Sequence, residues 1–211
     1  MITIYWHCLG MTEADETFVN SAIQELAHHL KEEPIKLLIS IKRLGDKPDI
    51  AKQVDAILND PSYTFSNCAG DILYSFFKEG IFKEGVPPKL LVYCRPDSYI
   101  ARAALREKPS AKWGANCGSF SAAYPPKDQL KSKFTIWHEA LHLLELDECY
   151  DENTLRRKCK CKTCVMQYKP PLGVDENWPS RLCDNLCGRQ KRKLKNLANK
   201  VAKVEKGKRS S

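Results

Sequence analysis

Residues 2–41, ITIYWHCLGMTEADETFVNSAIQELAHHLKEEPIKLLISI, decide the fold of this protein. The stretch opens and closes with short apolar runs, at 2–6 and 35–41, which predict buried strands. Between them, apolar side chains recur at helical spacing: Phe18, Ile23, Leu26 and Leu30. Acids near the start of this segment suit the positive end of a helix dipole. The stretch therefore predicts a strand, a helix and a second strand.

The same alternation of patterns continues downstream. Helices are predicted over 48–60 and 68–80, and a further strand over 89–94. Because strands that alternate with helices tend to pair in parallel, we expect an α/β (α+β) fold with a largely parallel sheet. The stretch 113–126, WGANCGSFSAAYPP, mixes small and aromatic residues and ends in two prolines, which predicts an exposed edge strand and a turn.

Length and composition bound the class of protein. The 211 residues, 43% of them apolar, are enough for one domain of ordinary size with its own core. The apolar runs are too short to cross a bilayer, and the start MITIYWHCLG lacks the basic segment and long apolar stretch of a secretory signal. We therefore expect a cytoplasmic protein that does not enter a membrane.

Cysteine usage points to metal. Ten cysteines in a chain of this kind predict metal-binding or buried thiols rather than disulfides, because cytoplasmic thiols are kept reduced. Six of them lie between Cys149 and Cys187. The other four occur singly, and we expect them to be buried as small apolar side chains: Cys8, Cys68, Cys94 and Cys117.

The stretch 134–150, FTIWHEALHLLELDECY, carries the candidate chemistry. On a helix, His138 and His142 lie on one face a turn apart, so both imidazoles can bind one zinc ion while Glu139 leans toward a water molecule. Zinc lowers the pKa of that water, and the carboxylate can take its proton and pass it to a leaving amine. The alternative is an amphipathic core helix with two buried histidines.

A catalytic zinc needs a third protein ligand, and no histidine follows His142. The nearby candidates are all acids: Glu145, Asp147, Glu148 and Glu152. A ligand from the later loop instead, at Asp175 or Glu176, would indicate a zinc peptidase of another clan.

The segments HEALHLLELDEC, CVM and CDNLC together resemble the extended motif of the archaemetzincins, over residues 134–187. The resemblance implies a metzincin-like fold, whose twisted sheet has an antiparallel edge strand and whose lower lobe is small, irregular and stabilised by zinc. It places the catalytic zinc ligands at His138, His142 and Glu148, with Asp147 as a rival for the third position.

The resemblance also assigns roles around the metal. It implies that Glu139 is the general acid and base, and that Met166 forms an apolar floor beneath the histidines. It further implies that Tyr168 steadies the tetrahedral intermediate. An ordinary core methionine and a surface tyrosine are the alternatives for the last two residues.

Two residues depart from the family pattern. Glu145 stands where the family has a glycine that turns the chain back toward the metal, and glutamate is a poor residue for a left-handed conformation. Glu148 stands where the family has a histidine, although zinc accepts an oxygen ligand. We expect metal binding to tolerate these changes better than catalysis does.

A second, structural zinc would be held by four thiolates: Cys149, Cys164, Cys183 and Cys187. Cys159 and Cys161 are rivals, because CKCKTC offers three thiolates in six residues. Since Cys149 directly follows Glu148, this zinc would also fix the geometry of the first. We therefore expect two zinc ions per chain.

The positive charge of the chain lies in its last segment. Residues 188–211 contain ten Lys or Arg against one acid, a charge of +9. The net charge of the whole chain is +8, so the other residues together carry −1. Apolar side chains recur there at helical spacing: Leu194, Leu197, Val201 and Val204. We expect a basic tail with helical character that attracts nucleic acid or acidic surfaces in a salt-dependent way; a solvated terminus is the alternative.

The sequence thus predicts a single metzincin-like domain over 1–187, with an upper lobe 1–147 and a cysteine-rich lower lobe 148–187, followed by the tail. The predicted function is that of a zinc metallopeptidase, a hydrolase of peptide or protein substrates. As the resemblance implies, an extended substrate would pair with the strand near Gly118 to Tyr124. The alternative is a catalytically impaired, zinc-stabilised protein that binds nucleic acid or an acidic partner through its tail.

Overall fold

The computed structural model describes residues 1–32, 34–81, 87–110, 112–126, 132–150, 156, 158–167, 170, 174 and 178–207. Its centre is a five-stranded sheet in the order β2-β1-β3-β5-β4. The strands are β1 (Ile2–Leu9), β2 (Ile39–Arg43), β3 (Lys89–Cys94), β4 (Gly114–Cys117) and β5 (Phe120–Ala123). Neighbouring strands from β2 to β5 are parallel, and β4 runs antiparallel to β5. The predicted α/β class with a mostly parallel sheet is confirmed.

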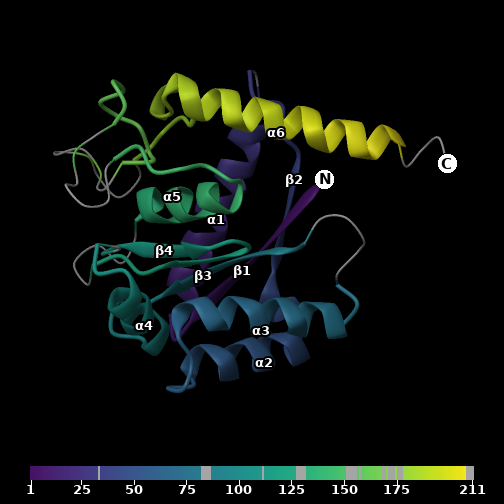
Figure 1. Ribbon diagram of the computed structural model, residues 1–211, viewed down its shortest axis with the longest axis vertical. Helices are drawn as coiled ribbons and strands as arrows, with labels where there is room; N and C mark the ends of the chain where they lie inside the picture. Colours follow the sequence, from purple (N-terminus) through teal and green to yellow (C-terminus); the bar gives the residue numbers. More distant parts are fainter. Residues whose placement is uncertain are drawn as a thin grey trace.

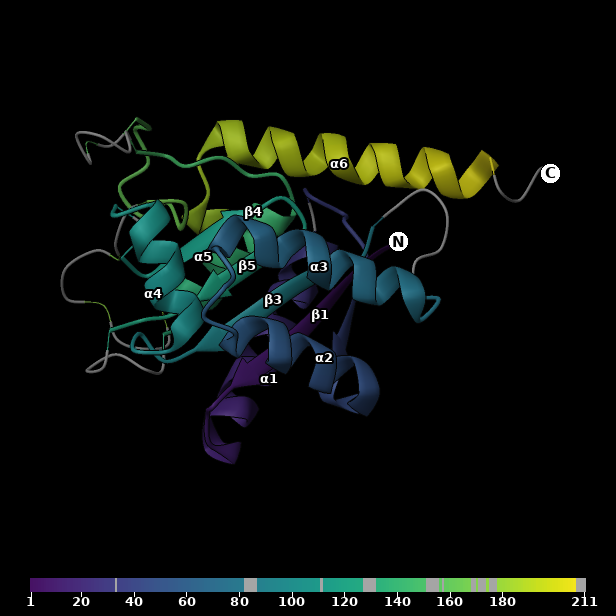
Figure 2. The same ribbon diagram turned by 60° about the horizontal axis from the view of Figure 1, so that its bottom comes forward.

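Helices cover both faces of this sheet (Figure 1). The helices α1 (Glu13–Lys31) and α5 (Lys133–Leu143) pack on one face, and α2 (Pro48–Asn59), α3 (Phe65–Lys78) and α4 (Tyr99–Glu107) pack on the other. The long helix α6 (Gly188–Gly207) forms a further layer outside α1 and α5 (Figures 1 and 2). Short 3-10 turns occur at η1 (Leu44–Asp46) and η3 (Cys183–Asn185). None of the helices in the described ranges has the length and apolar character of a membrane span.

The two faces of the sheet are buried by alternate side chains of the same strands. In β1, Ile4 and Trp6 join the core under α1 and α5, whereas Tyr5 joins the core under α2 and α3. In β3, Leu91 joins the core under α1 and α5, and Val92 joins the core on the other face. Because consecutive side chains of a strand point to opposite faces, apolar runs without polar alternation are what a sheet covered on both sides requires.

The stretch predicted as one edge strand forms two strands. β4 and β5 make a tight hairpin, and Gly118 takes a left-handed conformation (φ 60°) at its turn. β5 pairs with β3 on one side and β4 on the other, so the prediction that the strand near Gly118 to Tyr124 pairs with a peptide is wrong. Among the described residues, β4 is the strand at that edge of the sheet.

The singly occurring cysteines belong to the fold. Cys8, Cys68 and Cys94 are buried, as predicted, whereas Cys117 at the end of β4 is half-buried. Burial raises the pKa of the Cys68 and Cys94 thiols to about 12. These thiols are therefore protonated and inert at neutral pH, in keeping with a packing role.

Candidate metal centre

The helix α5 carries the paired histidines and is held between α1 and the sheet. Ser132 caps its first turn by accepting a hydrogen bond from Thr135 N (3.3 Å). Trp137 Nε1 donates to the carbonyl of Ala22 in α1 (2.7 Å). Every residue of the helix except His142 is buried, and His142 is half-buried. The helix therefore presents its polar side chains from a fixed position.

Two hydrogen bonds set the tautomers of the histidines. His138 Nδ1 lies 2.8 Å from Val165 O, and His142 Nδ1 lies 2.8 Å from Leu146 O. Because a carbonyl oxygen can only accept, each Nδ1 must carry the hydrogen, and in the neutral rings each Nε2 is left with a lone pair. The two Nε2 atoms nevertheless lie only 3.1 Å apart. Two such acceptors repel each other unless a proton or a metal ion lies between them.

Glu148 completes this convergence of acceptors. Its Oε1 lies 2.9 Å from His142 Nε2, and its Oε2 lies 3.3 Å from His138 Nε2. The buried Oε2 has no hydrogen-bond partner among the described residues. Zinc bonds of about 2.0–2.1 Å place tetrahedral ligand atoms about 3.3 Å apart, close to these separations. The donor set therefore fits a small divalent cation and supplies only three of its four ligands.

Asp147, the rival third ligand, is directed elsewhere. Its Oδ2 lies 2.5 Å from Lys193 Nζ and 3.4 Å from an Arg189 nitrogen, both on α6. These cations neutralise the carboxylate outside the histidine pair. Of the two adjacent acids, the structure brings only Glu148 to the histidines.

Glu139 lies beside the three acceptors and is buried in the helix. Its Oε2 lies 2.6 Å from Ser121 Oγ of β5, which can donate to it. Burial raises the pKa of Glu139, while His142, His138 and the Ser121 hydrogen bond oppose the rise. The carboxyl group is thereby prepared to accept a proton closer to neutral pH than an exposed glutamate would.

Gly114 in β4 makes room for this carboxyl group. A Cβ atom at Gly114 would lie 2.2 Å from Glu139 Oε1, a separation that no real contact shows. Neither Gly114 nor Ser121 was among the predicted site residues. A glycine inside a strand is a signal for the close approach of another group, but the sequence does not say which group approaches.

The turn after α5 aims the second histidine. Glu145 takes a left-handed conformation (φ 66°), and its N–H donates to His142 O (2.9 Å), while Leu146 N–H donates to Leu141 O (3.2 Å). This is a Schellman cap with glutamate at the position that glycine usually fills. The turn brings Leu146 O to His142 Nδ1, so Glu145 adopts here the left-handed conformation that glycine usually supplies.

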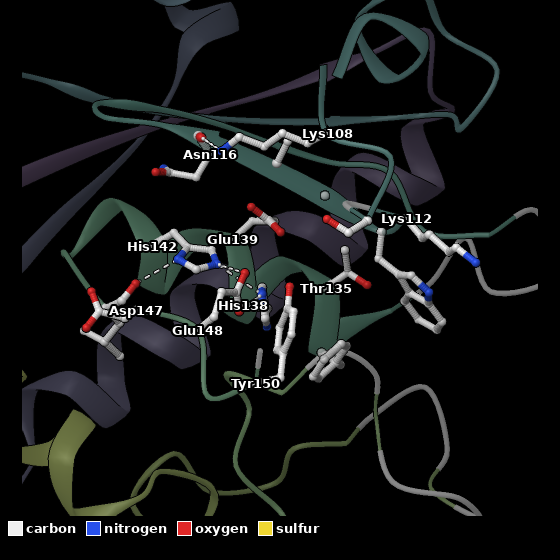
Figure 3. Close-up of a pocket in the computed structure, with 16 residues that line it drawn as sticks. Lys108, Lys112, Asn116, Thr135, His138, Glu139, His142, Asp147, Glu148 and Tyr150 are labelled. Atoms are coloured by element: carbon white, nitrogen blue, oxygen red, sulfur yellow. Dashed lines mark hydrogen bonds and ion pairs between the residues drawn. The ribbon is translucent and has the colours of Figure 1, made fainter. Parts of the chain in front are cut away.

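The group opens into a cavity of about 300 Å³ (Figure 3). In the close-up, Tyr150 directs its hydroxyl toward the space between α5 and β4 beside His138, and Lys108 and Asn116 lie across from Glu139. Tyr150 was not predicted, although it directly follows the cysteine adjacent to Glu148. The open position of the acceptor set therefore faces a space that a ligand can enter.

Of the remaining residues predicted for this site, the structure describes only Met166. Met166 is fully buried in the core that also contains α5, and its carbonyl accepts from Cys149 N (2.7 Å). Tyr168, predicted to steady an intermediate, lies outside the described residues. So do the alternative ligands Asp175 and Glu176.

Four cysteine sulfurs converge next to the His–Glu group. Those of Cys149, Cys159, Cys164 and Cys187 all lie within 4.8 Å of one another. Cys149 Sγ is 3.5 Å from Cys187 Sγ and 3.6 Å from Cys164 Sγ. Zinc–sulfur bonds of about 2.3 Å would separate tetrahedral sulfurs by about 3.8 Å, so the four thiols fit a closed metal site.

The structure corrects one member of the predicted cysteine set. Cys159, a rival in the sequence analysis, takes the position assigned to Cys183, and Cys161 is not in the group. Lys158 N–H donates to Cys149 O (2.6 Å), which brings Cys159 beside Cys149. The 3-10 turn η3 holds Cys183 apart from this cluster. Spacing along the chain could not distinguish these arrangements.

The thiols differ in their acidity. The hydrogen bond from Cys164 lowers the pKa of Cys149 to about 5, against the effect of burial, and contacts with Gln190 and Cys187 add to the shift. Burial raises the pKa of Cys159 to about 11. Its neighbours therefore favour the thiolate form of Cys149, and because metals bind thiolates, metal binding to the cluster would release protons.

Neither a protein-family model nor a curated protein matches the sequence. The geometry defines two groups of side chains that could hold metal ions: His138 and His142 with Glu139, and four cysteines. Glu148 also lies within 3.3 Å of both histidines. Cavities border both groups, so the number of ligand atoms distinguishes them: the four sulfurs can fill the coordination of a tetrahedral metal ion, whereas His138, His142 and Glu148 leave one position free.

Replacing Glu145 by glycine should raise the free energy of unfolding by about 0.5–1 kcal/mol. The left-handed conformation costs a residue with a Cβ about 1–2 kcal/mol, whereas the extra backbone freedom of glycine costs about 0.5–1 kcal/mol. Urea unfolding measures the change, and Glu145→Ala is the control that removes the carboxylate but keeps the strain. Equal stability of the two variants would contradict the expectation.

Metal binding to the His–Glu group should strengthen by about tenfold per pH unit up to pH 9. Burial disfavours the charged His138, but Glu148, Glu139 and the Val165 carbonyl outweigh it and raise the His138 pKa to about 9. Below that pH, a metal ion must displace one proton. Calorimetry in buffers of different ionisation heat, on protein whose cysteines are already loaded, should show one proton released at pH 7. An affinity independent of pH between 6 and 8 would exclude this linkage.

Proposed function

We propose that the protein is a zinc-dependent metallopeptidase resembling the archaemetzincins. The observation that carries the proposal is the convergence of His138, His142 and Glu148 acceptors, with a buried Glu139 beside them and a cavity in front. Zinc is the metal that accepts both this nitrogen and oxygen set and the neighbouring four-sulfur set. When bound at the histidines, it would supply the positive charge that acidifies a water molecule and polarises a peptide carbonyl.

Glu139 is the proton carrier in this mechanism. Its carboxylate takes the proton from the attacking water and later delivers it to the departing amine. Ser121 Oγ, 2.6 Å from Oε2, keeps one carboxyl oxygen oriented, so that Oε1 remains for the reacting groups. The raised pKa of Glu139 favours the pick-up and the release of a proton in the same catalytic cycle.

Tyr150 is suited to the role that the resemblance to the archaemetzincins implies for Tyr168. Its hydroxyl enters the cavity beside His138 (Figure 3). A hydroxyl at that position can donate a hydrogen bond to the negative oxygen that develops when the peptide carbonyl is attacked. We therefore assign the oxyanion contact to Tyr150.

An extended peptide would bind along β4. Tyr124 N donates to Trp113 O (2.8 Å), so in the antiparallel register the alternate residues Trp113, Ala115 and Cys117 direct their backbone groups toward β5. Gly114 and Asn116 then direct theirs to the outer edge of the sheet. A peptide that adds as a further strand there would pass directly over Glu139, which lies against Gly114.

Replacing Glu139 by glutamine should abolish peptide cleavage while both metals stay bound. The amide keeps the shape of the side chain but cannot accept the proton, and loss of a general base lowers the rate by about 10²–10⁴-fold. Gly114→Ala, which displaces the same carboxyl group, should give a similar loss. Cleavage of a peptide library and zinc content by elemental analysis are the measurements.

The matched control for this test is Cys117→Ala, which alters the opposite face of β4, away from Glu139. Glu148→Ala should instead lose one of two zinc ions. Cleavage by the Glu139→Gln protein at the native rate would refute the mechanism. Retention of two zinc ions by the Glu148→Ala protein would remove Glu148 from the ligand set.

A second candidate function is the binding of nucleic acid, favoured by exposed lysines on α6. Lys195, Lys200 and Lys203 are exposed there and make no ion pair within the described ranges. Replacing all three by glutamine should weaken binding to an oligonucleotide and reduce its salt dependence. Lys31, Lys47 and Lys52, replaced together, are the control. Equal loss in both triple variants would show that only net charge matters.

A further inference from the structure

The first two turns of α6 lie against the segment that carries Glu148. Arg189 Nη2 donates to Glu148 O (3.2 Å), Gln190 Nε2 to Asp147 O (2.5 Å) and Cys149 Sγ (3.3 Å), and Lys193 Nζ to Glu145 O (3.4 Å) and Asp147 Oδ2 (2.5 Å). Residues more than forty positions later in the chain thus donate hydrogen bonds to most of the segment 145–149. The helix α6, predicted as a basic tail of helical character, thus contacts the segment that carries Glu148 of the candidate metal centre.

Gln190 is the central residue of this contact. It is fully buried (0% exposed), and the two hydrogens of its amide reach the residues immediately before and after Glu148. One hydrogen bond ends on the backbone of Asp147, and the other ends on a sulfur of the four-cysteine group. A single side chain therefore joins the segment holding the third ligand to the neighbouring metal group.

The oxygen of the same amide has no comparable contact. Gln190 Oε1 is buried without a hydrogen-bond partner among the described residues. A buried acceptor without a partner is destabilising, and an apolar side chain of equal length would fill the space without that cost. A glutamine at this buried position is therefore expected only if its two N–H donors make hydrogen bonds that the protein needs.

We propose that Gln190 is a positioning residue that couples the two metal groups, by holding the Asp147–Cys149 segment so that Glu148 meets His138 and His142. The coupling rests on the proposed function only in requiring that the His–Glu group bind a metal ion. Groups that orient metal ligands from outside the ligand set typically change metal affinity by about 10- to 100-fold.

The test replaces Gln190 by methionine in the full chain. Methionine keeps the length and burial of the side chain and removes both donors. Zinc affinity of the His–Glu group, measured by chelator competition, should fall about 10- to 100-fold. The absorption bands of cobalt bound to the cysteines should shift, because a hydrogen bond to Cys149 is lost. Amide hydrogen exchange over residues 145–149 should accelerate.

Leu194→Met is the matched control. Leu194 is equally buried one turn further along the same face of α6, and it packs without hydrogen bonds to the segment. It should leave both affinities and the cobalt spectrum unchanged. If the control lowers the affinity as much as Gln190→Met does, the role of Gln190 is merely structural and the proposal is overturned.

A second pair of variants tests the same contact in case the Gln190→Met protein does not fold. Lys193→Met removes two bonds to the same segment from a half-buried position, and Lys195→Met removes an exposed lysine without such bonds. Only the former should weaken the His–Glu group, by about tenfold. Native affinity in both Gln190→Met and Lys193→Met would overturn the coupling.

The outcomes separate the coupling from the function. If the native protein loads both groups but cleaves no peptide, the proposed function fails and the affinity comparison still decides the coupling. If the native protein loads only the cysteine group, the coupling is overturned as well.

Discussion

Two hydrogen bonds from histidine Nδ1 atoms to main-chain carbonyls are the constraint on which the candidate site depends. They turn both Nε2 lone pairs toward the same point as the Glu148 carboxylate. One carbonyl, that of Leu146, belongs to the turn that ends α5, and the other, that of Val165, lies next to Cys164 of the cysteine group. The histidines are therefore oriented by the segment after the helix, so an α5 taken alone would not define a metal site.

Much of the fold follows from sequence periodicity, and the deviations have local causes. β2 begins at Ile39 instead of residue 35, because Lys36 takes a left-handed conformation (φ 57°) and only Ile35 and Leu37 on either side of it are buried. The helix α4 was not predicted, since its core contacts are made largely by alanines, which give a weak apolar period. The hairpin at Gly118 was taken for one strand because its two arms together have the length of an ordinary strand.

The candidate site was predictable where its residues are neighbours in the chain. His138, Glu139, His142 and Glu148 are named by helical spacing and by resemblance, and the structure gathers them. Ser121 and Gly114 could not be foreseen, because they reach Glu139 only through the packing of α5 on the sheet. The choice of Cys159 over Cys183 likewise depends on a backbone contact at residue 158, which no spacing encodes. Site residues that are close in the chain can thus be predicted from sequence spacing, whereas residues that reach the site through tertiary packing cannot.

The distance along the chain between Glu148 and α6 has a consequence for the order in which the site is assembled. Proteins are synthesised from the N-terminus, and domains begin to fold as they emerge. The histidine helix and Glu148 leave the ribosome some forty residues before Gln190, whose bonds hold their segment. A chain still under synthesis therefore has the candidate ligand residues without the hydrogen bonds from Gln190, and the arrangement proposed for the metal site is completed only when α6 has been made.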